Sequence, residues 1–537
     1  MSSPISLSPD LAWASGRPHP LDHGGPVDVP FEPLGQWAEG PVLERVDEMV
    51  RRHPAKIAVD DGVVRITYAE LKRQVDDLAA RIDDEAPRER PVAAIVHTTA
   101  GFVPILLAAI ATGRTLVIID AGYPIERQKM VFAAAQPGAV LLSADRKADD
   151  SFVPPELPRI VNDPKGTGSR TRPPLRKHDG PLWVMFTSGS TGKAKGLAYS
   201  AEGGLTSFGP WVEAAHLNEN DVILSVGSPA IGGGGDVLMA LLLGATVRIL
   251  DLRATGLVEA FRQLAQERVT VLSFVPTALR SIFRMPGAKE AFHSLRLLVL
   301  FGESTLASDI ALFRANLPKD CAISITLAST EASGVFQWFV RDEAITGPVI
   351  PVGYVSPFRE VALVGEDGRN VAIGEVGQIV VRARTMASGG WEDGHLTPPP
   401  SFEDPTRPGY RIYATGDYAS LREDGLYEFA GRLDQQVKIR GLKADLGVVE
   451  AGLRGFPGVL DAVTLLLSPE TKLVAFVTLQ PGLPADAVPR AVREGLARAM
   501  PDHMVPSQVM VLEAIPRLHN HKPDRVRLMA MARGEPG

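Results

Sequence analysis

The sequence predicts an α/β protein: a large N-terminal domain of layered, largely parallel sheets with helices and a small β-rich part, followed by a small α+β domain. Strand-like apolar runs alternate with helical stretches up to about residue 350, and this alternation is typical of parallel sheets covered by helices. Beyond about residue 350 we expect shorter strands separated by many turns. From about residue 435 the pattern changes to a compact mixture of helices and strands.

Apolar residues three and four positions apart predict a first helix at Val42–Val50, which precedes a short strand at Ile57–Val59. A second helix is expected to begin at Tyr68 and to run through Ile82. The strands expected in the main sheets are Val92–Val96, Thr115–Ile119, Ala139–Leu142, Val222–Val226, Val247–Leu250, Val271–Val275 and Leu297–Phe301.

The later strands are expected at Val361–Val364, Gln378–Val381 and Tyr427–Ala430. In the last unit a helix contains Glu450, and an amphipathic helix covers Ala485–Met500. The strands of this unit are expected at Val459–Leu467, Leu473–Leu479 and Val509–Leu512. We therefore divide the chain into an N-terminal extension (1–36), a large domain (37–433) and a small C-terminal domain (434–537).

Composition narrows the class of protein. A chain of 537 residues is too long for one hydrophobic core, and 45% hydrophobic with 22% charged residues is typical of soluble globular proteins. The net charge of −7 favours neither nucleic acid nor membrane as a partner. The single cysteine, Cys321, cannot form an internal disulfide, which fits the cytoplasm. We expect no signal peptide and no membrane-spanning segment.

The most informative segment is TSGSTGKAKG, residues 187–196, directly after the apolar run Leu182–Phe186. Small residues let backbone N–H groups turn inward, and a lysine adds positive charge, so a strand leading into such a loop predicts phosphate binding. The loop of P-loop NTPases is excluded, because Thr187 stands where that motif needs glycine and Lys193 is followed by Ala194. Taken alone, Gly-Ser-Thr-Gly is also common in polar surface turns.

The whole string resembles the nucleotide loop of the adenylate-forming enzymes, the superfamily of acyl-CoA synthetases, luciferases and nonribosomal peptide synthetase adenylation domains. That family usually has proline where this chain has Ala194. The resemblance implies a catalytic role for Lys195 beside the phosphates of ATP. The loop residues it assigns to ATP binding are Thr187, Ser188, Gly189, Ser190, Thr191 and Gly192.

A second block, Thr326 to Glu331, resembles the Tyr-Gly-x-Thr-Glu motif of the same family. It implies that Thr326 and Thr330 bind ATP and that Glu331 binds Mg²⁺, an ion that prefers hard oxygen ligands. An isolated Thr-Glu pair is equally typical of a helix N-cap. This chain departs from the motif at Leu327, in place of the tyrosine that stacks on adenine, and at Ala328, in place of glycine.

Two further blocks concern the nucleoside. Gly302, Glu303 and Ser304 resemble the stretch that lines the adenine slot. Asp417, in YATGD, and Arg432, in GRLDQQVKIRG, match the aspartate and arginine that hold the ribose in this family. A carboxylate can accept hydrogen bonds from ribose hydroxyls, although an isolated Gly-Asp pair would simply predict a turn.

The C-terminal blocks concern the mobile small domain. By resemblance, Asp434 is the hinge between the two domains, and Lys438 and Gly441 face the active site in the thioester-forming conformation. Lys522, in NHKPDR, matches the catalytic lysine that contacts both the carboxylate and the α-phosphate, although His521 replaces the usual glycine. Positive charge aimed at a developing pentavalent phosphate is electrostatic catalysis. A lysine in a polar turn is otherwise usually a solvated surface residue.

The acid-binding segment departs most from amino-acid-activating domains. Their Phe-Asp-x-Ser motif supplies an aspartate for the α-ammonium, but an ungapped register places Ile231 there, and Asp236 falls on the following helix. An ammonium group beside Ile231 would be desolvated without a partner. Phe301 is expected to shorten the pocket. The residues expected to bind the acid are Ile231, Gly232, Gly235, Val299, Phe301, Gly334 and Val335.

The resemblance covers about residues 35–530 and implies an enzyme that uses ATP and Mg²⁺ to convert a small carboxylic acid to an acyl-adenylate. The acyl group would then pass to the phosphopantetheine thiol of a carrier protein in trans. An acyl-CoA ligase that uses coenzyme A is the close alternative. A catalytically degenerate member that only binds nucleotide or partner is a third, favoured by Leu327 and Ala328.

Overall fold

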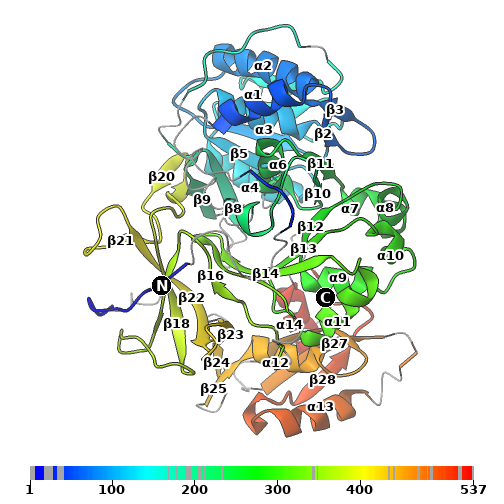
Figure 1. The fold of residues 1–537 in the computed structure, drawn as a ribbon, viewed down its shortest axis with the longest axis vertical. Helices are drawn as coiled ribbons and strands as arrows, with labels where there is room; N and C mark the ends of the chain where they lie inside the picture. Colours follow the sequence, from blue (N-terminus) through cyan, green and yellow to red (C-terminus); the bar gives the residue numbers. More distant parts are fainter. Residues whose placement is uncertain are drawn as a thin grey trace.

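A computed structural model describes most of the chain. The described residues are 7–16, 28–32, 42–166, 168–176, 180–187, 195–201, 209, 212–230, 234–341, 345–347, 349–432, 436–439, 442–467, 472–480, 482–483, 488–517 and 523–534. Within them, the chain forms two large mixed sheets, a third sheet and a small C-terminal unit, which lies at the bottom of Figure 1. This architecture confirms the α/β class predicted from the sequence.

The first large sheet has the strand order β20-β19-β9-β8-β5-β4-β6-β7. Neighbouring strands from β8 to β7 are parallel, and β9 and the β19–β20 hairpin extend one edge with antiparallel pairs. Its strands are β4 (Val92–Val96), β5 (Leu116–Asp120), β6 (Ala139–Ser143), β7 (Arg159–Asn162), β8 (Trp183–Thr187), β9 (Lys195–Tyr199), β19 (Gly389–Glu392) and β20 (His395–Thr397).

The second large sheet has the order β16-β15-β14-β13-β12-β10-β11-β2-β3, with parallel pairs from β14 to β2 and antiparallel pairs at both edges. Its strands are β2 (Ile57–Asp60), β3 (Arg65–Thr67), β10 (Val222–Ser225), β11 (Thr246–Ile249), β12 (Val271–Phe274), β13 (Leu297–Phe301), β14 (Ala322–Ser329), β15 (Ser333–Phe339) and β16 (Tyr354–Val355). The helices along this part are α7 (Leu252–Thr255), α8 (Leu257–Leu264), α9 (Pro276–Ile282), α10 (Ala288–Ala291) and α11 (Ala307–Asn316).

The largest hydrophobic core joins the two sheets through helices α1 (Val42–Arg52), α2 (Tyr68–Glu85), α3 (Phe102–Ala111) and α6 (Gly234–Leu242). Every residue of α3 is buried, because its sequence is apolar on all faces. Helix α2 begins at Tyr68 as predicted, and a capping box between Thr67 and Glu70 fixes its first turn. Helix α4 (Ile125–Ala135) follows β5.

The third sheet has the order β1-β17-β18-β22-β21, with β23 paired to β22. The expectation of shorter strands here was wrong for two of them, since β18 has 8 residues and β22 has 11. A register shift near Gln378 and the positive φ of Gly416 interrupt the regular alternation, so the long strands are hard to recognise in the sequence. The strands are β1 (Ala14–Ser15), β17 (Glu360–Val364), β18 (Val376–Ala383), β21 (Phe402–Glu403), β22 (Arg411–Leu421) and β23 (Tyr427–Arg432).

The C-terminal unit contains a three-stranded sheet, β26-β27-β28, and a separate β24–β25 pair. Its elements are β24 (Gln436–Ile439), β25 (Leu442–Asp445), α12 (Leu446–Arg454), β26 (Val459–Leu467), β27 (Lys472–Leu479), α13 (Val488–Ala499), β28 (Gln508–Val511) and α14 (Arg525–Arg533). Helix α12 contacts β23, and β26 contacts α9, so the unit packs against both the third sheet and the second large sheet (Figure 1).

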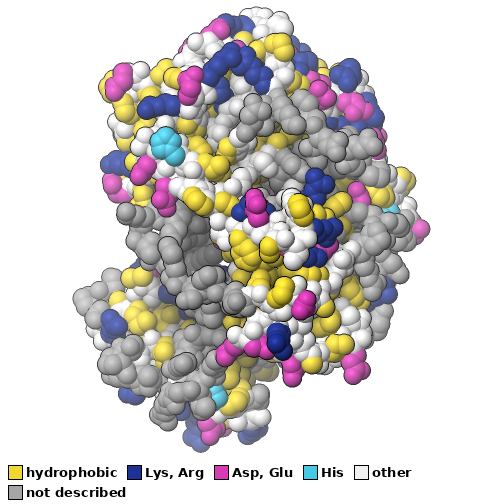
Figure 2. All heavy atoms as spheres, turned by 90° about the vertical axis from the view of Figure 1, so that its left-hand side faces the viewer, with side chains coloured by type: hydrophobic (Ala, Val, Ile, Leu, Met, Phe, Trp, Pro, Cys, Tyr) yellow, Lys and Arg dark blue, Asp and Glu magenta, His cyan; other side chains and the backbone are white. Residues whose placement is uncertain are grey.

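The described parts of the N-terminal extension are packed against the large domain. Strand β1 pairs antiparallel with β17, and the Trp13 ring lies 4.3 Å from the Arg382 guanidinium carbon. Farther along, Glu32 forms ion pairs with Arg45 and Arg52 of α1. On the face drawn in Figure 2, basic and acidic side chains are interspersed, in keeping with the mild net charge.

Candidate active site

The predicted phosphate-binding loop connects two paired strands. Strands β8 and β9 are antiparallel, and their register pairs Phe186 with Gly196 and Thr187 with Lys195. The seven intervening residues, 188–194, lie outside the described part of the chain, as do the side chains of Thr187 and Lys195. The structure therefore places the two ends of the loop, and the phosphate contacts of its residues stay a prediction.

Close packing holds β9 in position. A Cβ atom on Gly196 would lie 2.8 Å from the Trp391 Cβ and 2.9 Å from the Val184 Cγ1, so only glycine fits. On the outer side β19 pairs with β9, and the Ser388 N–H donates to the Ala198 carbonyl at 2.7 Å. The strand that leaves the loop is thus fixed from both sides.

The candidate metal ligand Glu331 lies in the turn between β14 and β15, and this turn is tied to β9. The hydroxyl of Tyr199, in β9, donates a hydrogen bond to the Thr330 carbonyl. The Ala387 N–H donates to the Glu331 carbonyl at 2.8 Å. Residues 131 positions apart in the sequence, Tyr199 and Thr330, therefore join the end of the phosphate loop to the Glu331 turn.

A tyrosine that the sequence analysis did not assign contacts this carboxylate. Burial raises the pKa of Tyr413, and the charge and the side-chain hydrogen bond of Glu331 raise it further. Burial, together with Glu331 and Tyr413, also raises the pKa of Tyr199. The two phenols stay protonated at neutral pH, so each can donate a hydrogen bond. The only sequence signal was that Tyr413 begins the block that ends in Asp417.

Asp417 and Arg432, the predicted ribose contacts, are brought together. They are opposite each other on β22 and β23, and Arg432 Nη1 lies 2.9 Å from Asp417 Oδ1. The Asp417 side chain is 5% exposed and that of Arg432 is 42% exposed. Asp417 and Arg432 both act electrostatically on Tyr413, so this pair and Glu331 share one neighbourhood.

The predicted adenine-slot residues follow β13. Gly302 has a φ of 81°, which glycine adopts without strain. The Glu303 carboxylate accepts hydrogen bonds from the Thr277 N–H at 3.1 Å and from the Thr277 hydroxyl, so it caps α9. Thr326 is opposite Phe301 in the parallel β13–β14 pair, and among the described residues its buried hydroxyl has no hydrogen-bond partner. Ser304 is partly buried.

The described residues of the predicted acid site lie on β13, β15 and α6. Val299 and Val335 are 1% and 2% exposed and belong to two different core clusters. Phe301 is 38% exposed at the end of β13, Gly334 is partly buried in β15, and Gly235 lies in the first turn of α6. Ile231 and Gly232 lie outside the described residues, so the composition of the acid site stays a prediction.

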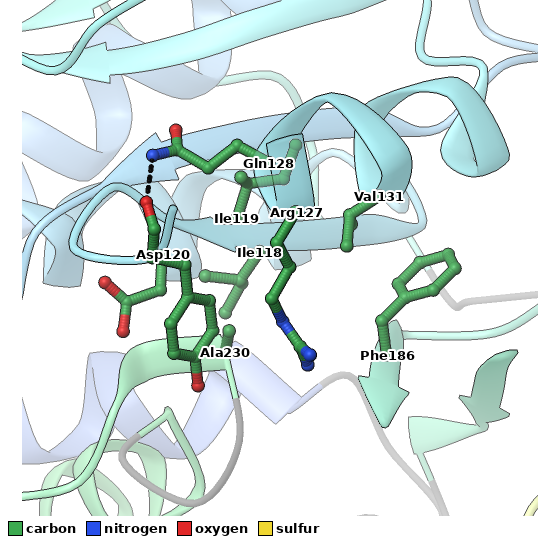
Figure 3. Close-up of a pocket in the computed structure, with 9 residues that line it drawn as sticks. Ile118, Ile119, Asp120, Arg127, Gln128, Val131, Phe186 and Ala230 are labelled. Carbon is green, nitrogen blue, oxygen red and sulfur yellow. Dashed lines mark hydrogen bonds between the residues drawn. The ribbon is translucent and has the colours of Figure 1, made fainter. Parts of the chain in front are cut away.

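A small cavity, partly open to solvent, lies at the C-terminal ends of β5 and β8 (Figure 3). None of the predicted site residues lines it, although Phe186 directly precedes Thr187 and Ala230 directly precedes Ile231. The lining residues are Ile118, Ile119, Asp120, Tyr123, Arg127, Gln128, Val131, Phe186 and Ala230. The C-terminal ends of parallel strands are where ligands bind in open α/β sheets.

A family model described as "AMP-binding enzyme" matches residues 46–391. The chain belongs to this family. Membership confirms the resemblance to adenylate-forming enzymes, and with it the expected class of ATP-using ligases. The matched range contains the phosphate loop, the adenine-slot residues and Glu331, and it ends before Asp417, Arg432 and Lys522.

Similar proteins come from peptide synthetases and carrier-protein ligases. Tyrocidine synthase 3 of Brevibacillus parabrevis is 28% identical over 90% of this chain, and the D-alanine–D-alanyl carrier protein ligase of Bacillus licheniformis is 26% identical over 91% of this chain and 98% of the ligase. The chain spans only 8% and 45% of the first two curated relatives it matches. The fold is similar to Klebsiella oxytoca NpsA in complex with 3-hydroxyanthranilyl-AMSN, with a TM-score of 0.75, 23% identity, and coverage of 92% and 99% of the two chains.

Three predicted residues of the C-terminal domain lie outside the described part of the chain: Asp434, Gly441 and Lys522. For Lys438 the backbone is described, in β24, but not the side chain. The hinge, the thioester-forming face and the catalytic lysine therefore stay predictions. No helix among the described residues has both the length and the apolar character needed to cross a bilayer.

The surroundings of Glu331 fit Mg²⁺ bound together with a nucleotide. Nowhere in the described part of the chain do three or more His, Cys, Asp or Glu side chains gather into a metal-binding group. Mg²⁺ commonly binds through one or two carboxylates together with substrate phosphates, and keeps several waters. A single carboxylate in a turn tied to the strand that leaves the phosphate loop is compatible with that mode of binding.

Proposed function

We propose that this protein uses ATP to activate a small carboxylic acid as an acyl-adenylate and then transfers the acyl group to a carrier-protein thiol. The Tyr199–Thr330 hydrogen bond carries the proposal, because it joins the strand leaving the phosphate loop to the turn that holds Glu331. Phosphates and Mg²⁺ must meet at one point in this chemistry, and a link between the strand that follows the phosphate loop and the Glu331 turn supports such a meeting point.

In the first half-reaction an oxygen of the acid attacks the α-phosphorus of ATP, forming the acyl–phosphate bond while pyrophosphate leaves. Mg²⁺ held by Glu331 would neutralise phosphate charge. The Asp417–Arg432 pair would hold the ribose, since the buried carboxylate accepts hydrogen bonds and the half-exposed guanidinium donates them. Lys522 would supply positive charge to the pentavalent phosphorus, and Lys195 would stabilise the departing pyrophosphate.

An ATP–pyrophosphate exchange assay with a panel of carboxylic acids tests this half-reaction. Exchange with at least one small acid that lacks an α-ammonium group is the expected result. Strongest exchange with a proteinogenic α-amino acid, and none with its desamino analogue, would show that Ile231 does not occupy the anchor position. The Lys522→Ala variant should bind ATP normally but lose exchange by about 10²–10³-fold. Exchange at the wild-type rate would remove Lys522 from the mechanism.

The carrier protein as acceptor is supported by the relatives, which include a D-alanyl carrier protein ligase. The acceptor is tested by offering the acyl-adenylate to coenzyme A and to phosphopantetheinylated carrier proteins from the same genome. Acylation of a carrier supports the proposal, whereas efficient transfer to coenzyme A alone favours the acyl-CoA ligase. Asp434→Pro should spare adenylation and block transfer, because proline restricts the backbone rotation of a hinge.

A catalytically degenerate member is favoured by one structural observation. The β14–β15 register shifts between Leu327 and Ala328, the two positions at which the motif departs from its family. In a degenerate member the protein would bind ATP in calorimetry but release no pyrophosphate with any acid. Acid-dependent pyrophosphate release excludes this alternative.

A further inference from the structure

The cavity at the ends of β5 and β8 contains a cationic side chain that the proposed mechanism does not use. Arg127 extends from α4 into the space between Ala230 and Phe186 (Figure 3). Its Nε is buried and has no hydrogen-bond partner among the described residues, and none of their carboxylates forms an ion pair with it. A guanidinium group carries five N–H donors in a planar fork, so this one has donors to offer a ligand.

The charges around the cavity do not balance. Asp120 also lines it, but one carboxylate oxygen is 3.0 Å from Arg253 Nη2 and the other accepts from the Gly122 N–H at 2.7 Å. Beyond Arg253, Asp251 forms an ion pair with Arg146 at 3.0 Å. Each of these carboxylates is matched by an arginine, whereas Arg127 is matched by none in the described structure.

The aromatic ring beside Arg127 holds the guanidinium in place. The Arg127 guanidinium carbon lies 5.0 Å from the centre of the Tyr123 ring, and that of Arg253 lies 5.8 Å from it. Burial raises the pKa of the Tyr123 phenol, so Tyr123 stays neutral. A neutral ring between two cations orients both guanidinium groups without neutralising either charge.

The position of the cavity links it to the proposed acid site. One wall, Phe186, precedes the first loop residue, and another, Ala230, precedes Ile231. A ligand group inside the cavity would therefore lie beside the residues that directly precede the acid-binding segment and the phosphate loop. Its other walls, Ile118, Ile119 and Val131, are apolar, and a cation in such surroundings has little water to compensate its charge.

We propose that this cavity binds a second acidic group of the substrate, so that the preferred acid is a short dicarboxylic acid or one with a similarly charged group. This inference rests on the proposed acyl-adenylate chemistry and specifies its substrate class. Arg127 would pair with the second carboxylate while the first reacts with ATP. The anionic group that binds Arg127 could also be a terminal phosphate of ATP. The experiment distinguishes a substrate carboxylate from an ATP phosphate.

The experiment compares succinic and glutaric acids with their monoamides, which have the same shape without the second charge. The wild-type protein should show a preference of about 10–100-fold in kcat/KM for the diacid in pyrophosphate exchange, because charge-assisted pairs are the strong ones. Arg127→Met should abolish that preference, and Arg127→Lys should restore part of it. Lys129→Met removes an exposed charge from the same helix and should leave the preference unchanged.

Binding is measured separately, by calorimetry of glutarate and its monoamide with the ATP-free protein. Glutarate should bind more tightly than the monoamide, and the difference should vanish in Arg127→Met. If no acid supports exchange, the proposed adenylation fails. The difference in binding between glutarate and its monoamide still shows whether the cavity binds a second carboxylate. Equal binding of the two ligands overturns the inference. The Arg127→Met substitution could instead raise the KM for ATP equally with all acids. That result would mean that Arg127 binds a phosphate of ATP, and it would also overturn the inference.

Discussion

Asp417 and Arg432 are opposite each other on adjacent antiparallel strands, and their side chains form an ion pair of 2.9 Å. The carboxylate is nearly buried, whereas the guanidinium is 42% exposed. A buried carboxylate needs its partner, because an uncompensated charge in the protein interior is costly. In the proposed complex the half-exposed arginine would donate to a ribose hydroxyl.

Asp417→Asn should raise the KM for ATP by about 10-fold, because it removes a charge-assisted acceptor worth about 1.5–3 kcal/mol. The measurement is the ATP dependence of pyrophosphate exchange, with the unfolding midpoint recorded in parallel. The matched control is Asp424→Asn, which breaks the Arg422–Asp424 ion pair in the turn of the same β22–β23 hairpin. A lower unfolding midpoint at an unchanged KM would mean that the Asp417–Arg432 pair is structural only.

Tyr413→Phe should raise the Mg²⁺ concentration needed for half-maximal exchange. The phenol forms a hydrogen bond with the Glu331 carboxylate, and without it the proposed ligand is less well oriented. We expect a shift of about 10-fold, the lower end of the usual range for such supporting groups. Tyr410→Phe is the control, since the Tyr410 hydroxyl bonds to Arg407 instead. If both variants have the same Mg²⁺ dependence as the wild type, Glu331 does not depend on Tyr413.

Gly196→Ala should destabilise the protein by about 1–3 kcal/mol, as is usual for overpacked interiors. The added methyl group would lie 2.8 Å from the Trp391 Cβ, which belongs to the neighbouring strand and cannot move freely. Urea unfolding measures the change. Gly180→Ala serves as the control, because nothing lies within 4 Å of a Cβ at that position. Equal stability of the two variants would contradict the tight β9–β19 contact.

Burial raises the pKa of Asp236, in the first turn of α6, to about 7. In the unfolded chain an aspartate ionises near pH 4, so between about pH 4 and 7 the unfolded state loses this proton first. The contribution of Asp236 to stability therefore falls as the pH rises through this range. Asp236→Asn should unfold at a higher temperature than the wild type at pH 8, with a smaller gain at pH about 4.

The control for Asp236 is Glu423→Gln, a charge removal at an exposed position. Its effect on the unfolding temperature should be small at both pH values. A gain in Asp236→Asn that is the same at low and high pH would show that the carboxylate ionises normally in the folded protein.

Cys321 should be unreactive in the native protein. Its thiol is buried, its side chain is 1% exposed, and burial raises its pKa to about 12, so almost no thiolate forms at pH 8. Titration with a chromogenic disulfide should detect no thiol in buffer and one thiol in denaturant. Cys321→Ser supplies the blank. Rapid reaction of the native protein would contradict the burial of Cys321.

Local elements could be read from the sequence because nearby residues determine them. The predicted strand Val459–Leu467 is β26 with the same bounds, since its run of β-branched and apolar residues is buried against α12 and α14. The start of α2 at Tyr68 follows from the Thr67–Glu70 capping box. The length of β22 could not be predicted in this way. Its pairs with β18 and β23 both contain register shifts, and the strand continues through them because it is paired on both sides.

By itself the sequence determined the α/β class, the nucleotide motifs and the family, because each depends on residues close together along the chain. Only the tertiary structure decided which distant groups meet. Tyr199 reaches Thr330, and Tyr413 reaches Glu331, across strands that are far apart in sequence. The Arg127 cavity likewise exists only because β5, α4 and β8 converge. Burial and the pairing of charges depend on such long-range packing, which local residue patterns do not encode.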